Sequence, residues 1–180
     1  RVVFEGGKQR EMLNLVNIGR DTATYSLSFI QYNMNEDGSF EIIQEPDSGQ
    51  MFADSYLRIF PRIVTLAPSE PQVIMLQYRR KANMRDGEYR SHLYFRSEEN
   101  YKPLGLNDTV STSTLLSVQL VPIYGLSIPV IIRSGSVHSS VTLSNIHLHT
   151  LEDGTQDLSL VINREGNKSV YGDIIIDYTP

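Results

Sequence analysis

Apolar and polar side chains alternate along one long stretch of this chain, from Leu116 to Ile132. Its even positions are almost all apolar: Leu116, Val118, Leu120, Pro122, Tyr124, Leu126, Ile128, Val130 and Ile132. Because successive side chains of a β-strand point to opposite faces, this period of two predicts one long strand with an apolar face. A typical strand has about five or six residues, so the expected strand is about three times longer than its own sheet requires.

Two prolines and a lack of charge predict that part of this strand lies at a sheet edge. Proline has no amide hydrogen for a sheet ladder, so Pro122 and Pro129 place the strand at an edge or at bulges. No charged residue lies between Asp108 and Arg133, although charged side chains normally protect such edges from other chains. Two interpretations follow: a strand that bends between two sheets of one sandwich, or an edge offered to a partner.

The chain before residue 133 otherwise has the pattern of an all-β protein. Short alternating segments are separated by turn residues such as Asp37-Gly38 and Asp86-Gly87. We expect strands at residues 2–5, 11–18, 23–32, 40–44, 56–63, 72–80 and 88–96. About seven or eight short strands of this kind are typical of an immunoglobulin-like β-sandwich, in which Tyr89 is a candidate tyrosine corner.

A second domain is expected after Arg133. The small polar residues of Ser134-Gly135-Ser136 and His138-Ser139-Ser140 interrupt the apolar pattern and are typical of a linker. Three further strands are expected, at residues 141–149, 157–162 and 170–178. Because three strands cannot close a sandwich, we expect residues 1–133 to form one immunoglobulin-like domain and residues 134–180 the start of a second, incomplete one.

Composition excludes several classes of function. The chain has 180 residues and a formal net charge of -5, and its lysines and arginines are scattered, so it lacks the basic surface of a nucleic-acid-binding protein. No apolar run approaches the roughly 20 residues that span a bilayer, and we expect a protein without membrane insertion. The absence of cysteine excludes a disulfide scaffold and a thiol nucleophile, and is compatible with a reducing or an oxidising compartment.

Few residues form patterns that indicate chemistry. His147 and His149 share a strand face and supply two ligands of a zinc site, but only Glu152 or Asp153 is nearby as a third, so a structural or surface role is the simpler interpretation. His92 is expected to point outward from the sandwich. The chain has no nucleophile elbow, phosphate loop or dinucleotide fingerprint. We therefore expect no enzyme activity, no metal and no cofactor.

Several segments keep an order and spacing seen in a known family. They are Arg1-Val2-Val3-Phe4-Glu5-Gly6, Leu13-Asn14-Leu15-Val16-Asn17, Pro61-Arg62-Ile63-Val64-Thr65-Leu66-Ala67-Pro68, Glu88-Tyr89-Arg90-Ser91-His92-Leu93 and Ser127-Ile128-Pro129-Val130-Ile131-Ile132. Over most of residues 1–133 they resemble the first domain of a periplasmic pilus-assembly chaperone (PapD-like, chaperone-usher pathway), nearest to the archaic branch. Residues 166–173 resemble the start of that family's second immunoglobulin-like domain.

The resemblance implies a periplasmic chaperone that keeps pilus or fimbrial subunits competent for assembly. In donor-strand complementation, alternate apolar residues of the last strand of the first domain enter the groove of a pilin that lacks a strand. Leu116, Val118 and Leu120 are the expected donated residues, with Tyr124 as a fourth. The implied partners are pilin-like subunits, with an outer-membrane usher as a further candidate. An unprotected edge also favours self-association through this strand.

The family also binds the carboxylate at the pilin C-terminus, through an arginine on the first strand and a lysine on the last. Arg1 matches the arginine, whereas the position of the lysine falls at Pro129. Arg133 matches an arginine that connects the two domains, and a solvated linker charge is its other interpretation.

Two alternative functions belong to other classes. One is a structural or adhesive immunoglobulin-like module of the cell surface, whose long strand completes only its own sheets. The other is an enzyme with a site between the two domains.

Overall fold

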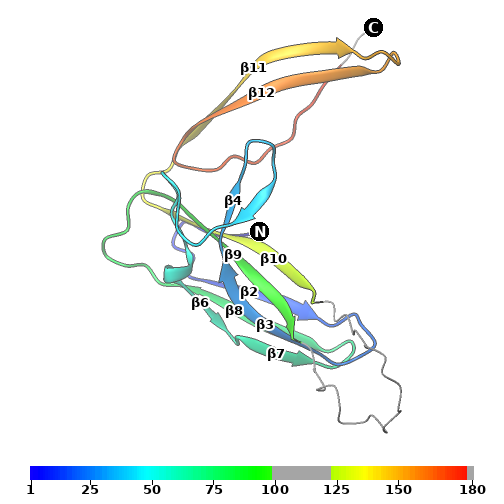
Figure 1. The fold of residues 1–180 in the computed structure, drawn as a ribbon. Coiled ribbons are helices and arrows are strands. Elements are labelled where there is room, and N and C mark those ends of the chain that lie inside the picture. The colour runs from blue at the N-terminus through cyan, green and yellow to red at the C-terminus, as the bar shows by residue number, and fades with distance from the viewer. Residues whose placement is uncertain (99–122, 178–180) are drawn as a thin grey trace, which may run out of the picture.

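The computed structural model describes residues 1–98 and 123–177 of this chain. These residues form an all-β fold, in which a five-stranded and a three-stranded sheet pack face to face as a sandwich (Figure 1). Two further pairs of strands form hairpins, and the longer hairpin extends away from the sandwich. The expectation of an all-β sandwich is therefore confirmed for the described residues before residue 135.

The two sheets of the sandwich draw their strands from all along the first domain. The larger sheet has the order β1-β10-β9-β3-β7, with β1 (Val2–Phe4), β3 (Ala23–Ile30), β7 (Ile63–Leu66), β9 (Gly87–Glu98) and β10 (Gly125–Ser134). The smaller sheet has the order β2-β8-β6, with β2 (Arg10–Val16), β6 (Leu57–Phe60) and β8 (Pro71–Tyr78). A short 3-10 helix, η1 (Asp54–Tyr56), precedes β6, and β4 (Tyr32–Met34) pairs with β5 (Phe40–Ile42).

The core lies between these two sheets and follows the period of two. On β9, Tyr89, Leu93 and Phe95 are at most 5% exposed, and they face Ile74 and Leu76 of β8, which are fully buried. The Tyr89 hydroxyl accepts a hydrogen bond from the Arg85 backbone N–H (2.9 Å) and donates one to the Arg85 carbonyl (3.2 Å). This contact to the backbone a few residues upstream is the geometry of a tyrosine corner, which confirms that prediction.

Two expected strands end earlier than the alternation indicates. The segment 56–63 is not one strand, because the chain bends at Pro61: β6 lies in the smaller sheet and β7 in the larger one. Pro61 has no N–H to donate to a neighbouring strand. The chain therefore loses no hydrogen bond of Pro61 when it leaves one sheet for the other at this residue. Likewise the segment 23–32 divides after Ile30, and Tyr32 begins the β4–β5 hairpin.

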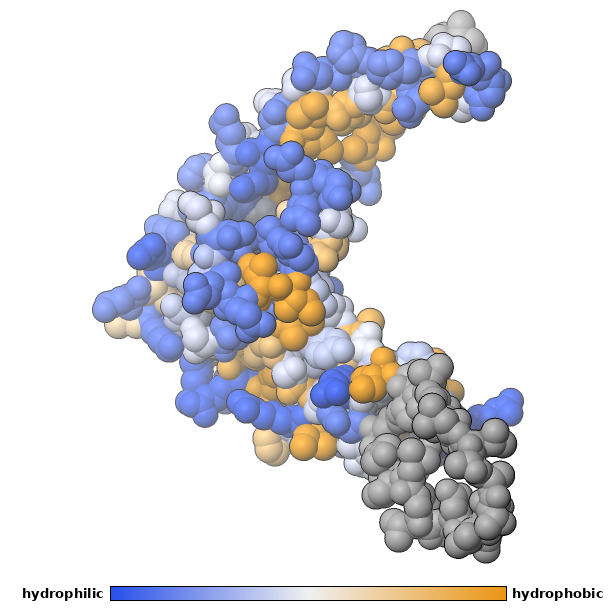
Figure 2. Space-filling model, in the orientation of Figure 1, coloured by the Kyte–Doolittle hydropathy of each residue, from blue (hydrophilic) through white to orange (hydrophobic). Residues whose placement is uncertain are grey.

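After residue 138, the described chain forms a hairpin of β11 (Ser139–Thr150) and β12 (Gln156–Gly166). Leu143 lies opposite Ile162, and Leu148 lies opposite Leu158. Apolar side chains gather on one face of this hairpin (Figure 2), and Leu143, Leu148 and Ile162 are each at least half exposed. A single hairpin is marginally stable in water, and these side chains lie outside the core of the sandwich.

The third strand expected in this region, 170–178, is absent from the described residues Val170–Asp177. Ile174 to Ile176 carry strand-forming side chains but are 55% to 85% exposed. A strand needs a neighbouring edge for its hydrogen bonds, and none of the described strands lies paired beside this segment.

The long strand expected from Leu116 to Ile132 is described only in its second half. β10 begins at Gly125 and continues to Ser134, two residues beyond the predicted end. Ile123 and Tyr124 precede it and are not part of the strand. Leu116, Val118 and Leu120, the three residues predicted to be donated, lie outside the described residues.

One buried polar side chain explains an exception in the core pattern. Ser91 is 1% exposed, and its hydroxyl oxygen accepts hydrogen bonds from the backbone N–H groups of Ala53 (2.9 Å) and Asp54 (3.0 Å). These donors lie at the start of η1, where a helical turn leaves N–H groups without partners.

We expect Ser91→Ala to lower the free energy of unfolding by about 1–3 kcal/mol. It leaves the Asp54 N–H unsatisfied and leaves the Ala53 N–H only its longer hydrogen bond to the Arg90 carbonyl (3.4 Å). Urea unfolding followed by circular dichroism measures this change. Ser28→Ala, on the exposed face of β3, is the matched control and should change stability by less than about 0.5 kcal/mol. Equal effects of the two substitutions would show that the Ser91 hydroxyl has no structural role.

Candidate functional site

Strand β10 has a neighbour on both sides over only part of its length. β9 pairs with it from Gly125 to Ser134, whereas β1 pairs only with Val130, Ile131 and Ile132 (Figure 1). Over Gly125–Pro129, no other described strand lies beside the second edge of β10. We call this segment the open edge.

The direction of the backbone groups shows what the open edge offers. The Tyr124 N–H donates to Ser97 Oγ (2.9 Å), and the Tyr124 carbonyl accepts from the Ser97 N–H (2.8 Å). The backbone groups of successive residues on an antiparallel strand point alternately to its two sides. Those of Tyr124 point to β9, so those of Gly125, Ser127 and Pro129 point to the open edge. Pro129 has no N–H, so it leaves no unpaired donor at the place where β1 begins to cover the strand.

The apolar row of even positions passes from the core to the surface along β10. Val130 and Ile132 are fully buried, and Ile128 packs partly buried against the same core. By contrast, Leu126 is 61% exposed and Tyr124 is 72% exposed. The inner half of the row therefore holds the strand in its own sandwich, and the outer half places apolar side chains beside unpaired backbone groups.

Arg1 lies at the end of the open edge. It immediately precedes Val2, which pairs with Val130, so the parallel register continues with Arg1 beside Pro129. Its guanidinium carbon lies 4.5 Å from the centroid of the Tyr171 ring, a cation–π distance. Arg1 thus neighbours the position at which the family resemblance expects a lysine.

Arg133 belongs to a cluster of charges where the sandwich meets the later part of the chain. Its side chain is 13% exposed and makes ion pairs with Glu5 (Nη1 to Oε2, 2.7 Å) and Glu88 (Nε to Oε2, 3.4 Å). Glu88 also accepts hydrogen bonds from the Ser169 N–H (3.2 Å) and the Ser169 hydroxyl (2.8 Å). Arg133 therefore connects to the segment after β12 through Glu88, and it is not a solvated linker charge.

Glu88 is the centre of this cluster, and its side chain is only 7% exposed. Arg90 donates to its second oxygen, Oε1, at 3.0 Å. Burial alone raises the pKa of Glu88, but the hydrogen bonds from Ser169 and Arg90 outweigh burial and lower the pKa below its ordinary value. The carboxylate is thus held ionised in a buried position.

Hydrogen bonds from the side chains of Asn167 and Asp86 to the backbone complete the joint between β10 and β11. The Asn167 side chain accepts a hydrogen bond from the His138 N–H (2.9 Å) and donates to the Ser136 carbonyl (3.0 Å). Asp86 accepts from the Ser136 N–H (3.1 Å), and a Cβ atom at Gly135 would collide with the Asp86 carboxylate. The segment expected to be a linker is therefore short and held by hydrogen bonds.

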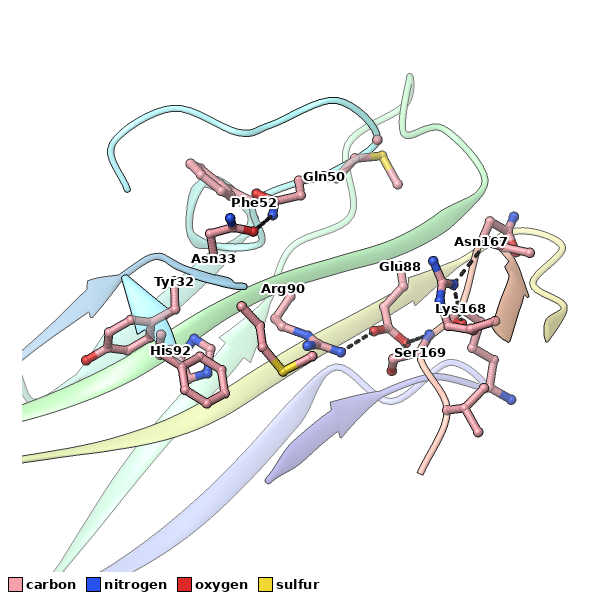
Figure 3. Close-up of a pocket in the computed structure, with 17 residues that line it drawn as sticks. Tyr32, Asn33, Gln50, Phe52, Glu88, Arg90, His92, Asn167, Lys168 and Ser169 are labelled. Carbon is pink, nitrogen blue, oxygen red and sulfur yellow. Dashed lines mark hydrogen bonds and ion pairs between the residues drawn. The ribbon is translucent and has the colours of Figure 1, made fainter. Parts of the chain in front are cut away.

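A hollow of about 480 Å³ lies between this joint, β9 and the β4–β5 hairpin (Figure 3). Its lining includes Glu88, Arg90 and Lys168 on one side and Tyr32 and His92 on the other. His92 points away from the core, as expected, but it is half-buried because the Tyr32 ring packs on it at 4.8 Å. Burial lowers the pKa of His92, and the positive charge of Arg90 adds to the effect.

His147 and His149 do not gather further ligand-type side chains among the described residues. His147 and His149 are both exposed, with ring centroids 6.1 Å apart, and His149 Nε2 lies 3.1 Å from Ser159 Oγ. Across residues 1–98 and 123–177, no group of three or more His, Cys, Asp or Glu side chains could hold a metal ion. In the same residues, no helix is long and apolar enough to cross a membrane.

The structure brings together some of the predicted site residues and adds others. Tyr124 lies beside the open edge, and Arg1 lies at its far end. Leu126 and Glu88 were missed as site residues. Leu126 is part of the alternating row that predicted the strand, so a signal existed, whereas nothing in the sequence relates Glu88 to Ser169, 81 positions later.

The fold places the protein in a known structural class. No protein-family model and no curated protein sequence matches this chain. Its structural neighbours are periplasmic pilus chaperones of the chaperone-usher pathway (PapD-like), including the archaic Csu chaperone. The resemblance predicted from the sequence is thereby confirmed at the level of the fold.

Three solved structures define the similarity. A chain of the chaperone–tip adhesin complex of CFA/I fimbriae biogenesis has a TM-score of 0.53 and 12% identity, and the match covers 92% of this chain and 64% of that one. A chain of the CsuC–CsuE pre-assembly complex of Acinetobacter baumannii Csu pili has a TM-score of 0.51 and 11% identity, and the match covers 93% of this chain and 74% of that one. The YadV chaperone has a TM-score of 0.50 and 11% identity, and the match covers 93% of this chain and 64% of that one. This chain thus spans less than two thirds of two of these three chains, and the likeness concerns the fold alone.

We expect the buried charge of Glu88 to make the joint sensitive to acid. Because the folded-state pKa is lowered, ionised Glu88 stabilises the fold above its ordinary pKa of 4.5, and this contribution is lost as the pH falls through the folded-state value. Glu88→Gln should therefore lower the free energy of unfolding by about 1–3 kcal/mol at pH 7, and the gap to the wild type should narrow toward pH 3.

Urea unfolding of both proteins between pH 7 and pH 3 measures that gap. Glu45→Gln, in an exposed loop, removes the same charge and should leave stability unchanged throughout. A gap for Glu88→Gln that stays constant down to pH 3 would contradict the assigned role of the carboxylate.

Proposed function

We propose that this protein is a periplasmic chaperone that binds pilus subunits by strand addition to β10 and catalyses no reaction. The observation that carries the proposal is the open edge, Gly125–Pro129, with the exposed apolar side chains of Tyr124 and Leu126 beside it. Such an edge normally recruits other chains, and natural proteins protect it with charge. No charged residue lies from 109 to 132 of this sequence.

The geometry supplies both affinity and register for an added strand. Backbone groups of Gly125 and Ser127 pair with any extended segment, so this part of the binding tolerates different client sequences. Leu126 and Tyr124 occupy alternate positions, and a client shifted by one residue would turn its pockets away from them. Val130 and Ile132 fix the strand in the core, so the edge is already ordered before a client binds.

The donated row is proposed to continue through Leu120, Val118 and Leu116. These residues keep the same parity as Leu126 and the same lack of nearby charge. Pockets for every second side chain along a client groove would then bind a segment of this chain that is longer than the open edge alone.

Arg1 is proposed to bind the C-terminal carboxylate of the client. It lies beside Pro129, where a strand added along the open edge reaches the start of β1. The hydrogen bond and the charge of Arg133 lower the pKa of Glu5, and the charges of Lys168 and Arg1 add to this effect. Lys168 lines the hollow beside Glu88, and it is proposed as a second candidate cation, in place of the lysine that the sequence lacks at Pro129.

Residues 134–180 are proposed to begin a second immunoglobulin-like domain. The exposed apolar face of the β11–β12 hairpin supports this, because such a face is stable only when further chain covers it. In this proposal Arg133 and Glu88 connect the two domains. The partners are pilin-like subunits and an outer-membrane usher in the periplasm.

We expect Leu126→Asp to weaken binding of a pilin-type domain that lacks one strand by at least about tenfold. The substitution places a charge into an apolar pocket of the client, which costs more than about 1.4 kcal/mol. Val118→Asp tests the continued row in the same way. Isothermal titration calorimetry with the purified domain measures both.

Ile18→Asp is the control, because Ile18 is 97% exposed in a loop far along the chain from β10. It should bind the client as the wild type does. Unchanged binding by both Leu126→Asp and Val118→Asp would exclude strand addition at this edge. Sedimentation of the isolated chain reports separately whether two open edges pair with each other.

A second experiment addresses the carboxylate anchor. We expect Arg1→Gln to lose at least about tenfold in affinity for a client with a free C-terminal carboxylate, since a hydrogen bond to a charged group contributes about 1.5–3 kcal/mol. A client with an amidated C-terminus should bind both proteins equally and more weakly. Arg20→Gln is the control, and an equal loss for both client forms would assign Arg1 a role in folding instead.

A further inference from the structure

The outer face of the three-stranded sheet carries an apolar row where solvent-facing polar residues are expected. Met12 of β2 pairs with Met75 of β8, and Met75 pairs with Phe60 of β6, so the three side chains form one row across all strands of the sheet. Met12 is 67% exposed and Phe60 is 70% exposed. Val73, two residues before Met75 on the same face, is also exposed.

A row of positive charge follows the apolar row. Arg10, Gln77 and Arg58 occupy paired positions two residues along the same three strands, and Arg62 lies two residues beyond Phe60, after Pro61. The arginines are exposed, and none of the three forms an ion pair within residues 1–98 and 123–177. A hollow of about 590 Å³ lies along β6 and is lined by Phe60, Met75 and two of these arginines, Arg58 and Arg62.

We call this surface the arginine face: Met12, Phe60, Val73 and Met75 with Arg10, Arg58 and Arg62. An apolar row bordered by cations fits an occupant that has the opposite charge beside apolar side chains. The remaining question is which polypeptide supplies that combination.

The β4–β5 hairpin of the same protein has that combination. Met34 pairs with Phe40 next to its turn, and Ile42 lies on the same face. All three are 63% exposed. Glu36 and Asp37 form the turn itself.

The charges of this chain are separated along its sequence. No lysine or arginine lies between Arg20 and Arg58, whereas that interval contains seven acidic residues: Asp21, Glu36, Asp37, Glu41, Glu45, Asp47 and Asp54. The hairpin is therefore acidic and apolar, and the arginine face is basic and apolar, within a protein of net charge -5. Figure 1 shows the hairpin extending from the sandwich toward β11 and β12, away from β6 and β8.

We infer that the β4–β5 hairpin of one copy docks on the arginine face of a second copy. Met34 and Phe40 contact the row of Met12, Met75 and Phe60, and the carboxylates of the turn meet the arginines. On a strand two residues span about 7 Å, so the step from the apolar pair to the acidic turn matches the step from the apolar row to the arginine row.

Such a contact joins two different surfaces, so it repeats head to tail and does not close in a dimer with twofold symmetry. Its exposed ion pairs make it weak and sensitive to salt. The contact leaves the open edge of β10 free, and it is independent of client binding.

Sedimentation velocity of the full chain at about 0.2 mM protein, in about 0.05 M and about 0.5 M salt, tests the inference. Association above the monomer mass of 20.4 kDa is expected at low salt and should be lost at high salt. Arg58→Glu and Glu36→Arg should each weaken the association by at least about tenfold, because each places like charges against one another. Arg20→Glu, an exposed arginine in the loop after β2 and outside the arginine face, is the matched control.

The two charge-reversed proteins provide a decisive mixture. In the mixture, the acidic hairpin of the Arg58→Glu protein can dock on the unchanged arginine face of the Glu36→Arg protein. The reversed hairpin of the Glu36→Arg protein can also dock on the reversed face of the Arg58→Glu protein. Mixing the two proteins should therefore restore association. Glu36 is preferred to Asp37 for this purpose, because Asp37 accepts hydrogen bonds from Ser39 that hold the turn.

Three outcomes would overturn the inference. A wild-type chain that stays monomeric at low salt leaves the arginine face to a different, acidic partner. Association that survives Arg58→Glu but is lost in Leu126→Asp belongs to the open edge of β10. A mixture that fails to associate shows that the two positions do not meet.

Discussion

Backbone pairing along β10 is the constraint on which the rest of the molecule depends. β9 satisfies one side of this strand throughout, whereas β1 is only three residues long and satisfies the other side only from Val130 to Ile132. The same strand is therefore a central core element at one end and an edge at the other. A longer β1 would convert β10 into an ordinary inner strand, with no backbone groups left to offer.

The buried half of the strand makes the exposed half usable. Val130 and Ile132 are fixed among the side chains of both sheets, so Leu126 and Tyr124 project from a rigid support. An isolated apolar strand would collapse or aggregate, and ordering it on contact with a client would cost entropy. Here the buried half of the strand orders the exposed half before any other chain binds.

Sequence patterns predicted the fold well where a local rule decides the structure. Alternation located most strands of the sandwich, and Tyr89 was recognised as a corner because its position at a strand start is informative by itself.

Sequence patterns failed where a distant residue decides the structure. The break at Pro61 depends on which sheet each half can join, and the described part of the 170–178 segment has strand-forming residues but pairs with none of the described strands. The role of Glu88 arises from Ser169 and Arg133, which only folding brings to it. Alternation also could not reveal that one half of the apolar row of β10 is buried and the other half exposed. A period of two shows which residues share a face, but it does not show whether another element packs on that face.

Gly135 and Asp86 lie at the base of the long β11–β12 hairpin, so a small change at this joint moves the far end of the hairpin by a large distance. β11 has 12 residues, which at about 3.3 Å each gives an arm about 40 Å long. A tilt of only about 10° at this point therefore carries the far end of the hairpin through about 7 Å, by simple trigonometry on that strand length. Gly135 has a φ of 63°, which L side chains rarely adopt, and an added Cβ atom would displace the exposed Asp86 side chain. A substitution at this position would therefore strain the base of the arm.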